Sequence, residues 1–188
     1  MRRPVSVRHS GRRQPAGGGR RPVEENACGP GPRCEFCEIV DGRAPASKIY
    51  EDAWTLAFMD INPVRRGHVL VIPKAHRPQV WDMSEVEGAR VLRCLPTLVR
   101  AVRSATSADA VDVLNLNGRA GGQSVFHTHF HLIPVHRRRP LLYRKGRVVV
   151  LRAWQRTASR AALEAVAKII RGRLSGTPTA RVAQGSDN

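Results

Sequence analysis

The apolar residues of this chain recur with two different periods, and each period predicts one kind of secondary structure. Alternating or short continuous apolar runs rich in β-branched residues are typical of strands. Such runs cover Tyr50 to Met59, His68 to Pro73, Val111 to Asn115, Val125 to Pro134 and a stretch within 141–151.

Two other segments repeat apolar residues every three or four positions, as amphipathic helices do. The first begins at Ser84, which forms a capping box with Glu87, and it runs to about residue 104. Pro96 lies inside this segment and predicts a kink or a split. The second runs from about Thr157 to Leu174, and we expect four of its side chains to face inward: Leu163, Val166, Ile169 and Ile170. The elements together predict an α+β fold with one antiparallel sheet and two main helices.

The two ends of the chain lack this periodicity. Residues 1–33 are dominated by glycine, proline and arginine, which predicts a disordered basic tail. We expect one domain over residues 34–175 and a disordered tail over 176–188. The amino-terminal stretch has no apolar segment of a secretory signal, and no apolar run reaches the roughly 18–20 residues of a membrane-spanning helix. We therefore expect no membrane partner.

The 188 residues carry a formal net charge of +17, most of it from arginine. This excess favours anionic partners such as nucleotides, nucleic acid or membrane lipid, but it does not choose among them. An arginine-biased genome would give the same composition. Because aromatic residues make up 5% of the chain, nucleobases have little to stack on, and a nucleic-acid partner is the weaker alternative.

The most informative segment is His127-Thr128-His129-Phe130-His131. In a strand, residues two apart share a face and lie about 6.5–7 Å from each other, so three imidazoles line up together. A glycine-rich loop, Asn117 to Ser124, leads into them. Its backbone N–H groups, around Gly122, and the side chains of Gln123 and Ser124 are suited to binding an anion. The combination predicts a phosphate pocket beside a nucleophile, and the basic run Arg137-Arg138-Arg139 is expected near its mouth.

Four cysteines are too few and too unevenly placed for a disulfide framework, which fits a cytoplasmic protein. Cys34 and Cys37 form a CxxC pair with the spacing of tetrahedral zinc ligands. A redox role is the alternative, but no thioredoxin-like βαβ pattern surrounds the pair. A zinc site needs two more donors, and the spacing alone does not choose among the seven histidines.

The segments CEFCEIVDGRAPASKIYED, LAFMDINPVRRGHVLVIPKAH and LNLNGRAGGQSVFHTHFHLIP resemble, in order and spacing, the blocks of the histidine-triad (HIT) family. The resemblance covers about Cys34 to Pro134. It implies that His129 attacks the α-phosphorus of a nucleotide and forms a covalent nucleotidyl-histidine. It also implies that His131 stabilises charge on the phosphoryl oxygens, and that Ser124 and Gln123 contact the phosphate or the leaving group.

The same resemblance implies a nucleotide-binding wall. Asp60 would accept hydrogen bonds from the ribose hydroxyls, Phe58 and Ile61 would pack against the base, and Asn62 belongs to the same block. Asn117 would lie near the ribose and phosphate. A plain exposed turn is the alternative for Asp60, and a type I′ turn is the alternative for Asn117.

Zinc-bearing members of the family imply the two missing ligands, which map onto His76 and His127. With Cys34 and Cys37 they would form a closed, structural zinc site rather than a catalytic one. His68 is the alternative third ligand, ranked behind His76.

Three features narrow the enzyme class that the resemblance implies. The third triad position is His131, where hexose-phosphate nucleotidyl transferases carry glutamine, and this favours hydrolysis. No cysteine follows Cys94, so an appended zinc finger is not expected, and residues 1–33 are too short for an amino-terminal domain. What remains is a phosphoramidase or dinucleoside polyphosphate hydrolase acting on a purine, AMP-type nucleotide. The alternatives are a nucleotidyl transferase and a basic nucleotide- or nucleic-acid-binding module with weak catalysis. Small family members pair into homodimers, and we expect the same here through the helix at 85–104 and an edge strand.

Overall fold

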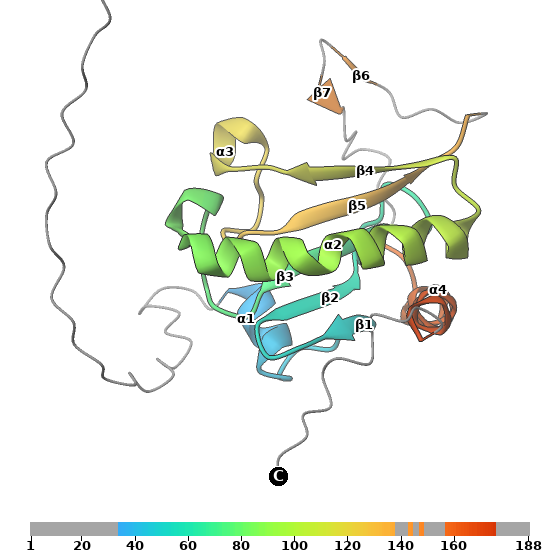
Figure 1. Ribbon diagram of the computed structural model, residues 1–188, viewed down its shortest axis with the longest axis horizontal. Helices are drawn as coiled ribbons and strands as arrows, with labels where there is room; N and C mark the ends of the chain where they lie inside the picture. The colour runs from blue at the N-terminus through green and yellow to red at the C-terminus, as the bar shows by residue number, and fades with distance from the viewer. Residues whose placement is uncertain (1–33, 138–142, 145–146, 149–156, 176–188) are drawn as a thin grey trace, which may run out of the picture.

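A computed structural model describes residues 34–137, 143–144, 147–148 and 157–175 (Figure 1). The two predicted tails, 1–33 and 176–188, lie outside these ranges, as does most of the extended stretch expected within 141–151.

The centre of the molecule is a five-stranded antiparallel sheet with the strand order β1-β2-β3-β5-β4. Its strands are β1 (Lys48–Glu51), β2 (Thr55–Met59), β3 (Val69–Pro73), β4 (Ala110–Asn115) and β5 (Phe130–Val135). A separate pair, β6 (Tyr143–Arg144) and β7 (Arg147–Val148), forms a small antiparallel ladder. The predicted α+β class with an antiparallel sheet is confirmed.

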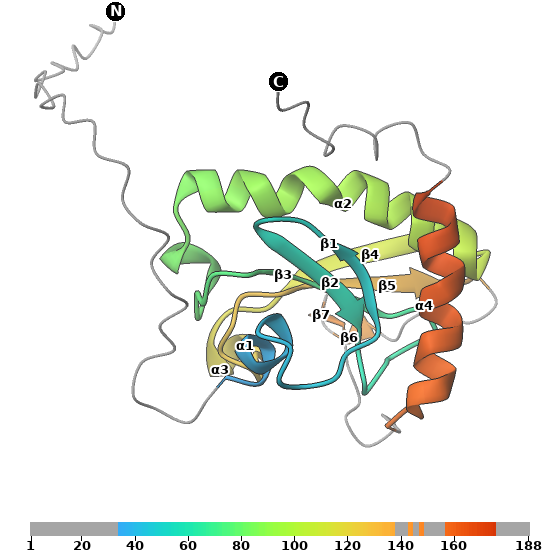
Figure 2. The same cartoon turned by 90° about the horizontal axis from the view of Figure 1, so that it is seen from below.

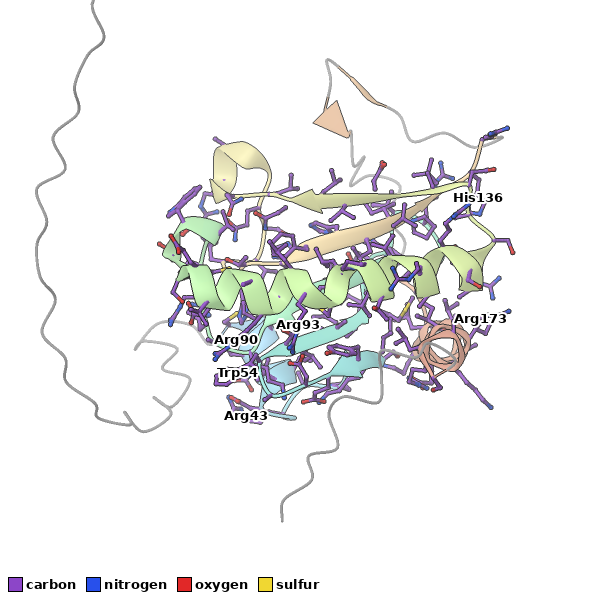
Figure 3. All side chains as sticks on the ribbon, viewed as in Figure 1. Arg43, Trp54, Arg90, Arg93, His136 and Arg173 are labelled. Carbon is purple, nitrogen blue, oxygen red and sulfur yellow. The ribbon has the colours of Figure 1, made fainter. Side chains whose placement is uncertain are left out.

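Two long helices, α2 (Glu85–Thr106) and α4 (Arg160–Leu174), contact each other and the sheet. Three short ones complete the described fold: α1 (Glu35–Val40), η1 (Val80–Asp82) and α3 (Gly118–Gly121). Figure 2 shows α2 on one side of the sheet, with α1 and α3 on the other. At the amino-terminal half of α2, the Arg90 guanidinium lies 3.6 Å from the centre of the Trp54 ring in the β1–β2 turn (Figure 3).

The strands β2 and β3 are buried on both faces of the sheet, which is why their apolar residues follow one another instead of alternating with polar ones. On the α2 and α4 side, Met59, Val71 and Leu132 join the inward residues of the two helices. On the α1 side, Phe58 and Leu70 pack with Phe36. Leu70 pairs with His131 across the sheet, so His131 belongs to the α1 side.

Several predicted boundaries were wrong, each for a local reason. The expected strand Tyr50 to Met59 is a hairpin, because Asp52 Oδ1 accepts from the backbone N–H groups of Trp54 and Thr55 (2.8 and 2.7 Å) and turns the chain there. Pro96 neither splits nor ends α2. Proline has no backbone N–H to donate, but Pro96 is exposed, so the carbonyl that would have accepted this hydrogen bond lies near solvent.

The carboxy-terminal helix α4 was predicted with two errors: it begins at Arg160 instead of about Thr157, and one of the four side chains expected to face inward does not. Leu163, Val166 and Ile170 are buried as expected, whereas Ile169 is 41% exposed. Among the described residues, no helix combines the length and the apolar character needed to span a bilayer.

Candidate active site and metal centre

The three histidines of the triad reach the site on the segment that leads into β5. His131 lies in β5, whereas His127 and His129 precede the strand, which begins at Phe130 instead of at Val125 as expected. Other elements hold this approach segment, since the Thr128 N–H donates to the carbonyl of Arg77 (2.6 Å). The triad therefore shares a site without sharing a continuous strand.

His129 is held in one orientation by its own backbone neighbourhood. Its ring is 4% exposed, and its Nδ1 lies 2.6 Å from the carbonyl oxygen of His127. A carbonyl only accepts, so Nδ1 carries the proton and Nε2 carries the lone pair. Burial lowers the pKa of this imidazole, partly offset by the hydrogen bond to His127 and the nearby Asp60 carboxylate. The result is a neutral ring whose Nε2 keeps its lone pair.

His131 begins a chain of hydrogen-bonding groups that runs away from His129. Its Nδ1 lies 2.9 Å from Nε2 of His68, whose Nδ1 lies 3.3 Å from Oδ2 of Asp60 and 3.3 Å from the Val64 N–H. The outer nitrogen, His131 Nε2, is buried and has no hydrogen-bond partner among the described residues. Burial lowers the pKa of both histidines to about 3, so both rings are neutral at pH 7.

Asp60, His68 and His131 also bring possible metal-ligating atoms within 4.8 Å of one another. His68, however, uses Nε2 toward His131 and Nδ1 toward Asp60, and one ring cannot offer both nitrogens to one ion. The 2.9 Å separation is that of a hydrogen bond. The geometry is that of a hydrogen-bonded chain.

A second cluster has the donor set of a zinc site: Cys34, Cys37, His76 and His127. Sγ of Cys37 lies 3.3 Å from His76 Nδ1 and 3.7 Å from His127 Nδ1, and Sγ of Cys34 lies 3.5 Å from His127 Nδ1. Tetrahedral zinc with ordinary bond lengths would separate a sulfur and a nitrogen ligand by about 3.6 Å. His127 Nε2 lies 2.8 Å from the carbonyl of Pro73, which accepts a hydrogen bond from Nε2–H and leaves Nδ1 for a metal. The residues present fit zinc, and His68 is not among them.

The glycine-rich loop is organised by the side chain of Gln123, which is 5% exposed. Its Oε1 accepts from the Gly118 N–H (2.7 Å), and its Nε2 donates to the carbonyls of Pro78 (2.6 Å) and Val125 (3.0 Å). These bonds commit the amide to the loop, so its predicted contact with phosphate gains no support from the geometry. Ser124 is exposed and Gly122 has a φ of +96°, at the turn that precedes the triad.

The remaining predicted nucleotide residues are distributed around the β2–β3 loop. Ile61 is 46% exposed and accessible to a ligand, whereas Phe58 is 3% exposed and lies beneath Phe36. Asp60 Oδ1 accepts from the Asn62 N–H (2.8 Å), and the Thr157 hydroxyl donates to Asn62 Oδ1 (3.0 Å).

Asn117, the last of the predicted set, accepts from the Val80 N–H (2.8 Å) and donates to Asn115 Oδ1 (2.5 Å). It precedes the short helix α3 with a φ of −120°, so it does not form the type I′ turn that was the alternative to a binding role. Its proposed role near the ribose stays a prediction.

Sequence reasoning missed three residues of this site. His68 was weighed as a metal ligand, although it contacts His131. Asn115 Nδ2 donates to the carbonyl of His129 (2.9 Å), and Phe36 lies against the His129 ring. The HVLVIP run could have indicated His68, since it places an imidazole at the start of a central strand. No sequence signal distinguishes Asn115 or Phe36 from ordinary strand and helix residues.

Comparison with known proteins identifies relatives of this chain. The family model described as "HIT domain" matches residues 41–138. "Adenosine 5'-monophosphoramidase hnt1" of Schizosaccharomyces pombe is 44% identical over 101 residues, which cover 54% of this chain and 73% of the relative. "Adenylylsulfatase HINT3" of Arabidopsis thaliana is 41% identical over 101 residues, and the match spans about half of its length (51%) and 54% of this chain.

One solved structure with the same fold is described as containing zinc. The zinc-bound histidine triad family protein from Mycobacterium smegmatis superposes with a TM-score of 0.62 at 34% sequence identity. The superposition covers 78% of this chain and 96% of the other. It therefore extends beyond the residues that the family model matches.

Proposed function

The chain belongs to the HIT domain family, and from this membership we propose that it is a nucleotide hydrolase that cleaves at the α-phosphate of AMP-type substrates. The names of two relatives, an adenosine 5'-monophosphoramidase and an adenylylsulfatase, support a substrate with an adenylyl group. The observation that carries the proposal is the buried, neutral His129 ring, whose Nδ1–H is held by a carbonyl while Nε2 keeps its lone pair.

In the proposed first step, Nε2 of His129 forms a bond to the α-phosphorus as the bond from phosphorus to the leaving group breaks. The leaving group departs with the bonding electron pair and takes up a proton. The ring becomes positively charged in the adduct, and the carbonyl of His127, 2.6 Å from Nδ1, stabilises that charge.

The chain Asp60–His68–His131 can supply the proton. With Asp60 protonated, Oδ2–H donates to His68, His68 Nε2–H donates to His131 Nδ1, and His131 Nε2–H faces the leaving atom. Transfer of His131's proton shifts one proton along each bond, leaving both rings neutral and Asp60 ionised. Burial raises the pKa of the Asp60 carboxyl, which suits it to hold that proton. Water then attacks the adduct, gives its proton to His131 Nε2 and resets the chain, releasing the nucleoside monophosphate.

For substrate binding we propose the predicted residues that remain accessible. Ile61 offers an apolar surface to the base, and Ser124 and the backbone around Gly122 offer donors to the phosphate. Asp60 keeps lone pairs for ribose hydroxyls. Cleavage of phosphoramidates and of dinucleoside polyphosphates follows the same chemistry with different leaving groups.

The test is to trap the adduct. His129→Ala should abolish turnover and remove the mass of a nucleotidyl adduct formed with an adenosine phosphoramidate, while AMP still binds. A variant that keeps more than about one hundredth of the wild-type rate would contradict the assignment, because loss of a nucleophile costs more than that. Transfer of the nucleotidyl group to an acceptor other than water would favour the transferase alternative. Salt-sensitive RNA or DNA binding without any turnover would favour the binding module.

We further propose that the Cys/His cluster holds a structural zinc ion. The donor geometry and the zinc-bound relative support it. When bound, zinc would cross-link α1, through Cys34 and Cys37, to the triad segment, through His127. Its four protein ligands would leave no open position for a substrate.

Purified protein, prepared without chelators under reducing conditions, should contain about one zinc per chain. Cys37→Ser should remove it and lower the melting temperature by about 10 °C, because a ligand bound to the folded state alone stabilises that state. Protein without zinc, or a Cys37→Ser variant as stable as the wild type, would contradict the proposal.

A further inference from the structure

A phenylalanine from α1 lies directly against His129. Phe36 sits on α1 between Cys34 and Cys37, and its side chain is 7% exposed. The centre of its ring lies 5.3 Å from that of the His129 imidazole, with the two ring planes perpendicular. The same ring lies 5.8 Å from the ring of His127. Helix α1 thus reaches the proposed nucleophile through one side chain.

The His129 imidazole is confined by three contacts. The Phe36 ring packs against it, and the centre of the His131 ring lies 4.8 Å from its own. The carbonyl of His127 accepts a hydrogen bond from Nδ1–H. Rotation of the imidazole would break the hydrogen bond and push against both rings. Such confinement matters because an attacking atom must stay aligned with its target, and a small misplacement costs a large factor in rate.

We propose that Phe36 is a positioning residue that holds the His129 ring so that Nε2 points at the α-phosphorus. With zinc bound, Cys34 and Cys37, on either side of Phe36 in sequence, would anchor α1 and so fix the place of the Phe36 ring. The role given to Nε2 rests on the proposed function. Packing without an effect on His129 is the competing explanation, since Phe36 also contacts Phe58 within the apolar cluster.

Phe36→Leu separates the two explanations, because leucine keeps an apolar side chain but removes the flat ring wall. Leu56→Val is the matched control: Leu56 is fully buried in the same cluster, lies in β2, and makes no ring contact with His129. Both variants are compared with the wild type as zinc-loaded protein, with zinc content measured in each.

In a single turnover with adenosine phosphoramidate, we expect Phe36→Leu to slow adduct formation by about tenfold or more. Its affinity for AMP should stay within about threefold of the wild type, and Leu56→Val should change neither value by more than about twofold. Equal losses in the two variants, or a Phe36→Leu effect confined to AMP affinity, would overturn the proposal.

A second readout does not depend on turnover. Nitrogen-15 spectra of the His129 ring should show one tautomer, protonated at Nδ1, in the wild type and in Leu56→Val. In Phe36→Leu the two ring nitrogens should move toward averaged shifts. An unchanged tautomer in Phe36→Leu would overturn the proposal even if adduct formation slowed. If the wild type forms no adduct with any substrate, the proposed function fails, and these spectra alone decide whether Phe36 orients His129.

Discussion

At the scale of single residues, the site depends on imidazoles that stay neutral because they are buried. His68 is 1% exposed, and its contacts are another imidazole, a carboxyl group and a backbone N–H. A positive charge there would lose its hydration and be repelled by the nearby His129, which is why the pKa of His68 falls. The same burial that makes these rings useful for proton transfer links the stability of the fold to pH.

We predict that the free energy of unfolding falls as the pH drops below about 6.5, the ordinary pKa of histidine. His68 and His131 have folded pKa values of about 3, so between those limits the unfolded chain binds protons that the folded chain does not. Each ring therefore lowers the free energy of unfolding by up to about 1.4 kcal/mol for each unit by which the pH falls.

Denaturant titrations between about pH 4.5 and 7.5, which cross the ordinary pKa of histidine, check this prediction. His68→Gln should unfold with a shallower pH dependence than the wild type, with zinc content followed in parallel. An identical slope in the two proteins would mean that the zinc ligands alone account for the acid sensitivity.

At the scale of elements, the turn before β3 places His68. Gly67 has a φ of +93°, a conformation that side chains disfavour. A Cβ at this position would also overlap Cγ2 of Thr106 at the end of α2 and approach Cγ of Pro134 to 3.2 Å. The helix and β5 thus close around a residue that has room only for hydrogen.

Gly67→Ala should therefore destabilise the protein by about 2–5 kcal/mol, the sum of backbone strain and overpacking. Gly42→Ala is the matched control, because Gly42 has a φ of +74° but nothing within 4 Å of the added Cβ. It should cost about 1–2 kcal/mol.

Adding Thr106→Ser to Gly67→Ala removes the overlapping methyl group and keeps the hydroxyl that donates to Val102. The double variant should recover part of the loss in stability. Thermal unfolding of the wild type, Gly67→Ala, Thr106→Ser and the double variant gives the coupling energy between the two positions. Equal costs at Gly67 and Gly42 would show that strain alone is responsible.

The elements also show what the sequence could and could not predict. Period and capping residues located β3, α2 and most of α4, because these elements bury a regular stripe. The hairpin at Asp52 and the late start of β5 were missed, since hydrogen bonds from single side chains and distant carbonyls decide them. Spacing brought out the triad and the CxxC pair. The contacts of Phe36, Asn115 and His68 depend on which elements meet, which no local pattern records.

At the scale of the whole molecule, distance limits what surface charge can do at the site. Arg137 was expected near the mouth of the phosphate pocket, but it pairs with Asp109. Arg137 follows His131 by six residues, which span about 20 Å in an extended chain. Its neighbour His136 lies at the end of β5, away from α1 and α3 (Figure 3). Because screening acts within about 8–10 Å, steering of substrates by Arg137 is not supported. Arg138 and Arg139 lie outside the described residues.

The sheet of the described molecule ends on one side at β4, which pairs with β5 on its inner side. A bare edge strand exposes backbone donors and acceptors to another chain. Val113 of β4 is 43% exposed and pairs with the buried Leu132, so it belongs to the α2 side of the sheet. On α2, Leu92 is 49% exposed. The edge and the helix thus offer apolar side chains on the same side of the sheet.

A twofold axis at this edge would pair β4 with β4 and α2 with α2, merging two sheets and covering both apolar side chains at once. We therefore predict a homodimer, with a mass by light scattering of about twice 20.8 kDa at micromolar concentration. Val113→Lys should produce the monomer, because two like charges would face each other across the axis. Val80→Lys, a change of similar exposure on η1, should leave the dimer intact. A wild-type mass near 20.8 kDa would contradict the prediction and leave the edge of β4 to be protected by some other means.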